Sequence, residues 1–65
     1  MTAVFIRDCA NRAVQVEMAR SLGGQVYQDP NGRIFAVSED VSSWPISSSA
    51  RRLELQAVPT DWSIV

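Results

Sequence analysis

The chain has 65 residues, fewer than the roughly 100 to 150 of a typical domain, so we expect one domain spanning residues 1–65. Its hydrophobic fraction of 46% and charged fraction of 20% exclude the disordered and collagen-like classes, and a net charge of −1 provides no general attraction for nucleic acid. There is no His, no Lys and one Cys, so the side chains of zinc sites, Schiff-base chemistry and His-based acid–base catalysis are missing. We therefore expect a binding protein without metal or cofactor, not an enzyme.

The first predicted elements are a strand and a helix. Residues 2–7 are rich in β-branched and aromatic side chains and too few for a helix, which predicts a strand buried on at least one face. Asp8 stands where an N-cap is expected, and apolar residues then recur at three- and four-residue steps: Ala10, Ala13, Val14, Met18 and Leu22. Cys9 and Val16 are expected to broaden this apolar stripe, and the side chains expected to point into water are Asn11, Arg12, Gln15 and Arg20. Gly23-Gly24 should end the helix, because glycine adopts the left-handed cap conformation without steric cost.

The second half of the chain is predicted to be mainly β. Residues 25–28 and 33–37 flank Asp29-Pro30-Asn31-Gly32, a turn sequence that predicts a hairpin in which Tyr27 and Phe35 are cross-strand partners. A serine-rich loop follows over residues 38–49. Alternating residues 52–57 predict a strand with one wet face, which Pro59 ends. The apolar tail, residues 59–65, should dock on the core or pair briefly at a sheet edge.

These elements predict an α+β domain in the order β-α-β-β-β. We expect one helix packed on a mostly antiparallel sheet of three or four strands. A domain of this size buries little surface, and a lone Cys cannot form an internal disulfide, so either the core is efficient or a partner completes it. Cys9 is interpreted as a buried structural thiol. The lone thiol and the short apolar N-terminus, interrupted by charges, predict a cytoplasmic protein that does not enter a membrane.

Acidic residues form the main candidate binding patch. Glu39 and Asp40 are adjacent, and Glu54 and Asp61 would share their side if the strand after residue 57 returned antiparallel beside its predecessor. Such a patch would fit an arginine- or lysine-lined groove on a partner, where complementary charge speeds association and fixes orientation. The alternative is a solvated rim that keeps a small protein soluble.

Two tryptophans are the candidate aromatic anchors. We expect Trp44, among serines, to be exposed and available to a partner, whereas Trp62 is better interpreted as a core filler beside the C-terminus. The arginines are scattered apart from Arg51-Arg52, and aromatic residues do not alternate with them, which disfavours direct nucleic-acid binding.

In length and character the chain resembles the small phage-encoded anti-CRISPR proteins. The features that carry this resemblance are the short chain, one helix on a small sheet, the absence of a catalytic set and the acidic doublet Glu39-Asp40. The resemblance implies an inhibitor, monomeric or homodimeric in the host cytoplasm, that blocks a CRISPR–Cas effector from engaging target DNA. Its carboxylates would occupy the place of DNA phosphates in the effector's basic groove. Two other functions stay open, a small nucleic-acid-binding regulator and an assembly subunit completed by oligomerisation.

Overall fold

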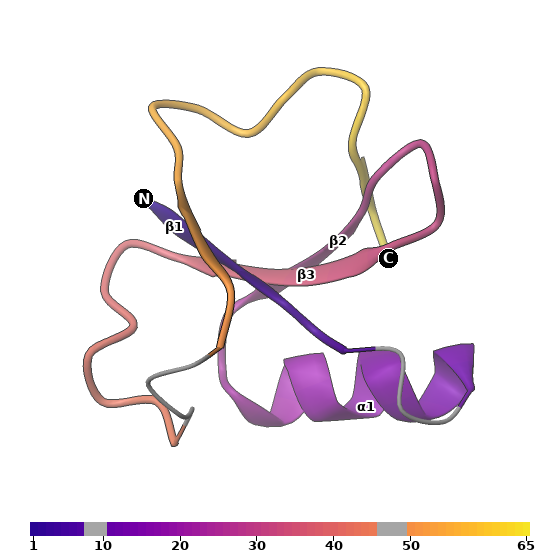
Figure 1. The fold of residues 1–65 in the computed structure, drawn as a ribbon, viewed down its shortest axis with the longest axis horizontal. Helices are drawn as coiled ribbons and strands as arrows, with labels where there is room; N and C mark the ends of the chain where they lie inside the picture. The colour runs from indigo at the N-terminus through magenta and orange to yellow at the C-terminus, as the bar shows by residue number, and fades with distance from the viewer. Residues whose placement is uncertain (8–10, 46–49) are drawn as a thin grey trace.

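Five strands and one helix make up the part of the chain that the computed structural model describes, residues 1–7, 11–45 and 50–65 (Figure 1). Every neighbouring pair of strands is antiparallel, in the spatial order β4-β1-β3-β2-β5. The elements are β1 (Thr2–Phe5), α1 (Arg12–Ser21), β2 (Gln25–Gln28), β3 (Ile34–Ser38), β4 (Arg52–Glu54) and β5 (Ser63–Ile64). The predicted α+β class is confirmed. The sheet has five strands where three or four were predicted, because the tail pairs with β2 as β5.

The strand β3 lies in the centre of the sheet, and this position explains why four of its five residues are buried. It pairs with β1 on one side and with β2 on the other, so β1 and β2 run parallel to each other without touching. Tyr27 and Phe35 lie directly opposite each other, as predicted, and Phe5 faces Phe35 from the other side. This register gathers three aromatic side chains in one row, because residues opposite each other point to the same face of a sheet.

The helix begins later than the sequence pattern indicates. Asn11 is its N-cap, and the Asn11 side chain accepts a hydrogen bond from the backbone N–H of Val14 at 3.0 Å. The predicted N-cap, Asp8, and the thiol residue Cys9 lie outside the described residues. The end of the helix is as predicted: Gly23 takes a φ of 92° and its N–H donates to the carbonyl of Arg20.

The prediction of which helix residues face the core was wrong for Val14 and Met18. The buried residues of α1 are Gln15, Val16 and Ala19, whereas Val14 and Met18 are 41% and 47% exposed. Fully buried Ala19 has no side chain beyond Cβ, so this face lets the helix approach the sheet closely. Gln15, expected in water, donates from Nε2 to the carbonyl of Arg7 at 3.2 Å, which satisfies a buried amide.

The hairpin between β2 and β3 is held by the side chain of Asp29. One carboxylate oxygen of Asp29 accepts from the backbone N–H groups of Asn31 and Arg33 at 3.0 and 2.8 Å. Gly32 has a φ of 83°, a conformation that favours glycine. The turn sequence therefore determines the hairpin as predicted.

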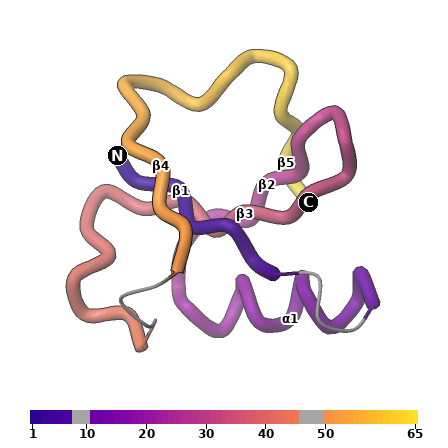
Figure 2. The backbone as a smooth tube through the Cα atoms, in the orientation of Figure 1, coloured from indigo at the N-terminus to yellow at the C-terminus, as the bar shows by residue number. Residues whose placement is uncertain are grey.

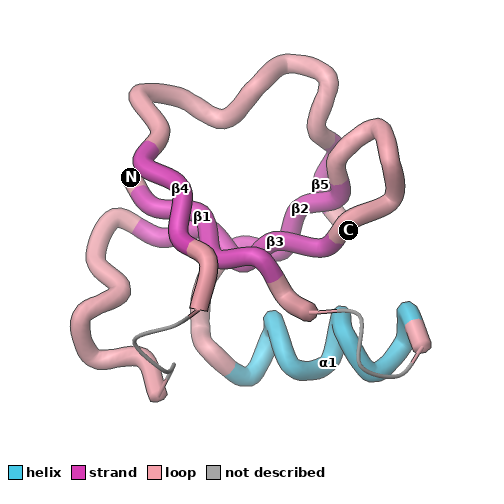
Figure 3. Tube along the Cα trace, in the orientation of Figure 1, coloured by secondary structure: helices cyan, strands magenta, loops and turns pink. Residues whose placement is uncertain are grey.

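The sheet is covered on both faces. Helix α1 lies on one face, over a core made of Ile6, Val16, Ala19, Val26, Ile34 and Ala36. The connection from β4 to β5, residues 55–62, crosses the opposite face and joins the two edges of the sheet (Figures 2 and 3). It contributes Leu55, Val58 and Trp62 to a second cluster around Ala3, Phe35 and Val37. This connection therefore serves as a partial second layer, which explains how so short a chain buries apolar residues on both faces of its sheet.

The described part of the serine-rich loop also packs on the core. Trp44 is half-buried against the helix-side core, whereas the sequence suggested an exposed ring. Its ring lies so close to Gly24 that a Cβ atom at that residue would be 2.7 Å from Trp44 Cη2. Gly24 thus makes room for the ring. Residues 46–49 of the predicted loop lie outside the described residues.

Candidate functional site

Three of the predicted acidic residues lie at one end of the sheet. Glu54 and Ser38 are both paired with Thr2, on either side of β1. Glu39 and Asp40 directly follow Ser38, so they lie at the same end of the sheet as Glu54. All three carboxylates are exposed. Their separation spans two strand spacings, about 10 Å, so the three carboxylates form a loose acidic end of the sheet.

The fourth acidic residue, Asp61, lies elsewhere. The strand after Asp61 pairs with β2 and not with β4, so the condition for placing Asp61 beside Glu54 is not met. β4 and β5 are the two opposite edges of the sheet, with three strands between them. A four-carboxylate patch is therefore not assembled by this fold.

Local hydrogen bonds already occupy part of the acidic end. The carboxylate of Asp40 accepts from the backbone N–H of Ser42 at 2.9 Å, and this bond, with a further one from the Ser42 hydroxyl, lowers the pKa of Asp40. Glu54 accepts a hydrogen bond from the Thr2 hydroxyl at 3.1 Å. These contacts fix two of the three carboxylates in place while leaving them in solvent.

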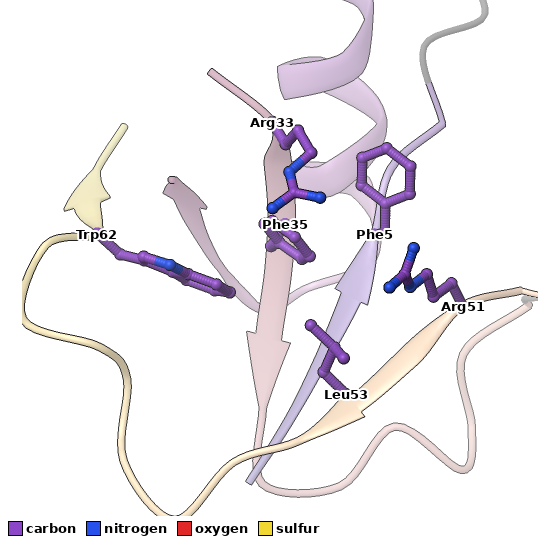
Figure 4. A pocket seen from close by; sticks show the side chains of 6 residues that line it. All are labelled: Phe5, Arg33, Phe35, Arg51, Leu53 and Trp62. Carbon is purple, nitrogen blue, oxygen red and sulfur yellow. The ribbon is translucent and has the colours of Figure 1, made fainter. Parts of the chain in front are cut away.

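The structure also forms a cleft that the sequence did not reveal. It opens on the face of the sheet opposite the helix, has a volume of about 80 Å³, and we name it the aromatic cleft (Figure 4). Its lining comes from the ends of three strands and from the C-terminal connection: Phe5, Arg33, Phe35, Arg51, Leu53 and Trp62.

The apolar part of the cleft is built from stacked rings. Phe35 is only 2% exposed and forms the floor. Trp62 stacks on it at a centroid distance of 4.5 Å and an interplanar angle of 22°, and Phe5 lies tilted against it at 5.6 Å. Such contacts between rings stabilise beyond the area they bury, by about 0.5 to 1.5 kcal/mol each. The rings therefore give the cleft a fixed shape.

Two arginines supply positive charge to the cleft. Arg33 has its guanidinium carbon 5.9 Å from the centre of the Phe35 ring, within cation–π range, and its Nε donates to the Asp29 carboxylate at 2.6 Å. The Asp29 side chain is 2% exposed and that of Arg33 is 50% exposed. Within residues 1–7, 11–45 and 50–65, the side chain of Arg51 has no hydrogen bond or ion pair. One arginine is thus held in place and the other is free to pair.

The side chains that line the cleft are aromatic, aliphatic or cationic. None of these six side chains carries a carboxyl, thiol or hydroxyl group. Among the described residues, no three His, Cys, Asp or Glu side chains gather as metal ligands. Within that same part of the chain, no helix has the length and apolar character needed to cross a membrane.

Sequence reasoning missed the cleft because its residues come from separate segments. Phe35 belongs to β3 and Leu53 to β4, Arg33 and Arg51 each directly precede one of these strands, and Trp62 directly precedes β5. Only the alternation of Arg33 with Phe35 and of Arg51 with Leu53 was a local signal, since residues two apart share a face of a strand. Strand order then brings the two pairs to the same face.

The ion pair under the cleft makes acid stability depend on Asp29. Burial raises the pKa of the Asp29 carboxyl, but the hydrogen bonds from Arg33 and Asn31 and the charge of Arg33 outweigh it, so the pKa lies below its ordinary range. A lowered pKa contributes stability that is complete above about pH 4 and is lost as pH falls through the folded-state value. We expect Asp29→Asn to lose less stability than the parent between pH 6 and pH 2.5, as measured by urea unfolding. Equal losses in the two proteins would contradict this assignment.

Comparison with known proteins gives no further guide to the site. No family model, curated protein or solved structure matches this chain.

Proposed function

We propose that this protein is a non-catalytic binding protein that contacts a protein partner through the aromatic cleft. The observation that carries the proposal is a ring-lined cleft whose rim holds an arginine, Arg51, with no side-chain partner among the described residues. Aromatic residues and arginine are the side chains that most often dominate binding energy at protein interfaces. A free charge beside desolvated rings also gains more from pairing than it would in open water.

Two adjacent arginines provide a matched test. Arg51 lines the cleft, whereas Arg52 follows it in β4 and points to the opposite face, and both are exposed. We expect Arg51→Glu to reduce capture of the dominant protein retained from a bacterial lysate at least fivefold, and Arg52→Glu to leave it within a factor of two. The two variants should have the same unfolding midpoint within a few degrees.

The result that would contradict the proposal is equally direct. Equal retention by the two variants, or a parent that retains no protein beyond those retained by Arg51→Glu, would remove the cleft as the contact site.

The acidic end of the sheet favours a second candidate function. Glu39, Asp40 and Glu54 are exposed together there, which suits a partner with a basic groove. An inhibitor of the anti-CRISPR kind would use these carboxylates in place of DNA phosphates at a CRISPR–Cas effector. The net charge of −1 and the separate location of Asp61 leave this end with fewer charges than a broad phosphate mimic would need.

Charge reversal distinguishes the two candidates. If the acidic end is the contact site, replacing Glu39 and Asp40 together by Lys abolishes inhibition of target-DNA binding by a purified effector complex. The control is the double variant Glu17→Lys with Asp61→Lys, which makes the same change in net charge away from that end and should inhibit as the parent does. Loss of inhibition in both double variants would indicate an effect of net charge, and retention in both would exclude the acidic end.

A further inference from the structure

We infer that the anchor taken into the aromatic cleft is a single acidic side chain of the protein partner. Its carboxylate would pair with Arg51 and with the terminal nitrogens of Arg33, and its aliphatic stem would lie on the cleft walls. This inference rests on the proposed function, because it names the chemistry that the same site recognises.

The charges around the cleft favour an anion over a neutral or cationic group. Arg51 has no partner within the described residues. Arg33 uses Nε for Asp29, which fixes the side chain and leaves its two terminal nitrogens free of the hydrogen bonds and ion pairs found in the described residues. A guanidinium held in this way loses less conformational freedom when it binds a carboxylate. Charge-assisted hydrogen bonds of this kind are among the strongest available to a protein surface.

The size of the cleft selects a side chain and not a larger ligand. A volume of about 80 Å³ is roughly a quarter of the lower limit for pockets that hold drug-sized molecules. It accommodates a group of a few heavy atoms, such as the end of a Glu or Asp side chain. The walls, Phe5, Leu53 and Trp62, are apolar and match the methylene groups that precede the carboxylate.

Nucleic acid fits the same surface less well. Proteins that bind single strands stack bases on exposed rings, but Phe35 is only 2% exposed and Trp62 already covers it. Asp61 is exposed next to Trp62 in the chain, so a row of phosphates crossing the tail would meet a like charge. With a net charge of −1 the molecule offers little counterion release to compensate. A single carboxylate requires neither exposed rings for stacking nor a row of contacts past Asp61.

The test uses the two indole N–H signals of the intact protein in nuclear magnetic resonance spectra. Trp62 lines the cleft, whereas Trp44 packs on the other face and serves as an internal control. A Trp44→Phe variant assigns the two signals. The probes are N-acetyl-Leu-Glu-Leu-amide, its Gln counterpart, inorganic phosphate and a short oligothymidylate.

We expect a saturable shift of the Trp62 signal with the Glu peptide, with Trp44 unmoved. The Gln peptide should bind the parent at least fivefold more weakly, and Arg51→Gln should weaken the Glu peptide to the same extent. No saturable shift with the Glu peptide, equal binding of the two peptides, or tighter binding of phosphate or oligothymidylate would overturn the inference. If both peptides bind the parent equally while Arg51→Glu still reduces partner capture, the proposed function stands and only the carboxylate anchor fails.

Discussion

Replacing Trp62 by alanine is expected to lower the free energy of unfolding by about 3 kcal/mol, the lower end of the range for removing a large aromatic side chain. Trp62 stacks on Phe35 at 4.5 Å and lies 6.5 Å from Tyr27, so its loss exposes the floor of the cleft and loosens the C-terminal connection. In a domain of this size such a change lowers the melting temperature by roughly 10 to 20 °C. Thermal unfolding followed by circular dichroism measures it.

A conservative variant shows how much of the lost stability comes from removing the ring over Phe35. Trp62→Phe keeps a ring over Phe35 and should lose less than half as much stability as Trp62→Ala. If the alanine variant melts within about 3 °C of the parent, the C-terminal connection does not stabilise the second sheet face, and the two-sided packing described above is wrong.

The second large effect is expected at Gly24. An alanine Cβ there would lie 2.7 Å from Trp44 Cη2 and 2.7 Å from the backbone oxygen of Val37, closer than atoms pack. Val37 belongs to the central strand, so the ring or the strand must shift. We expect Gly24→Ala to cost about 1 to 3 kcal/mol of stability, the usual range for overpacking.

A double-mutant cycle shows which neighbour resists the added atom. In a Trp44→Ala background the ring is gone, so Gly24→Ala should cost at least about 1 kcal/mol less than in the parent, as measured by urea unfolding. The same cost in both backgrounds would contradict this expectation and would show that the backbone oxygen of Val37, and not the ring of Trp44, resists the added atom.

Local sequence signals predicted most of the fold. The hairpin followed from Asp29-Pro30-Asn31-Gly32, because the side chain of Asp29 and the glycine backbone meet the needs of the turn without help from distant residues. The end of the helix at Gly23 was also predicted, for the same local reason. These features depend on residues close in the chain.

Features that depend on distant contacts were predicted less well. The helix has two overlapping apolar stripes. The stripe that contains Ala19 packs on the sheet, and the one that contains Val14 and Met18 is exposed. No local pattern indicates that choice. The position of Asp61 near the sheet edge opposite that of Glu54, and the presence of Arg33 and Arg51 in one cleft, both follow from the strand order β4-β1-β3-β2-β5. Strand order is set by packing of the whole chain, so the candidate site emerged only from the structure.

The most direct test of the central claim is to map the bound partner onto the protein by backbone and side-chain chemical shifts. The measurement uses labelled protein and the partner captured by the parent. The account predicts that the affected signals cluster at Phe5, Arg51, Leu53 and Trp62, while those of Met18 on the helix and Glu39 at the acidic end stay unchanged. Changes confined to Glu39, Asp40 and Glu54, with the cleft signals unmoved, would contradict it.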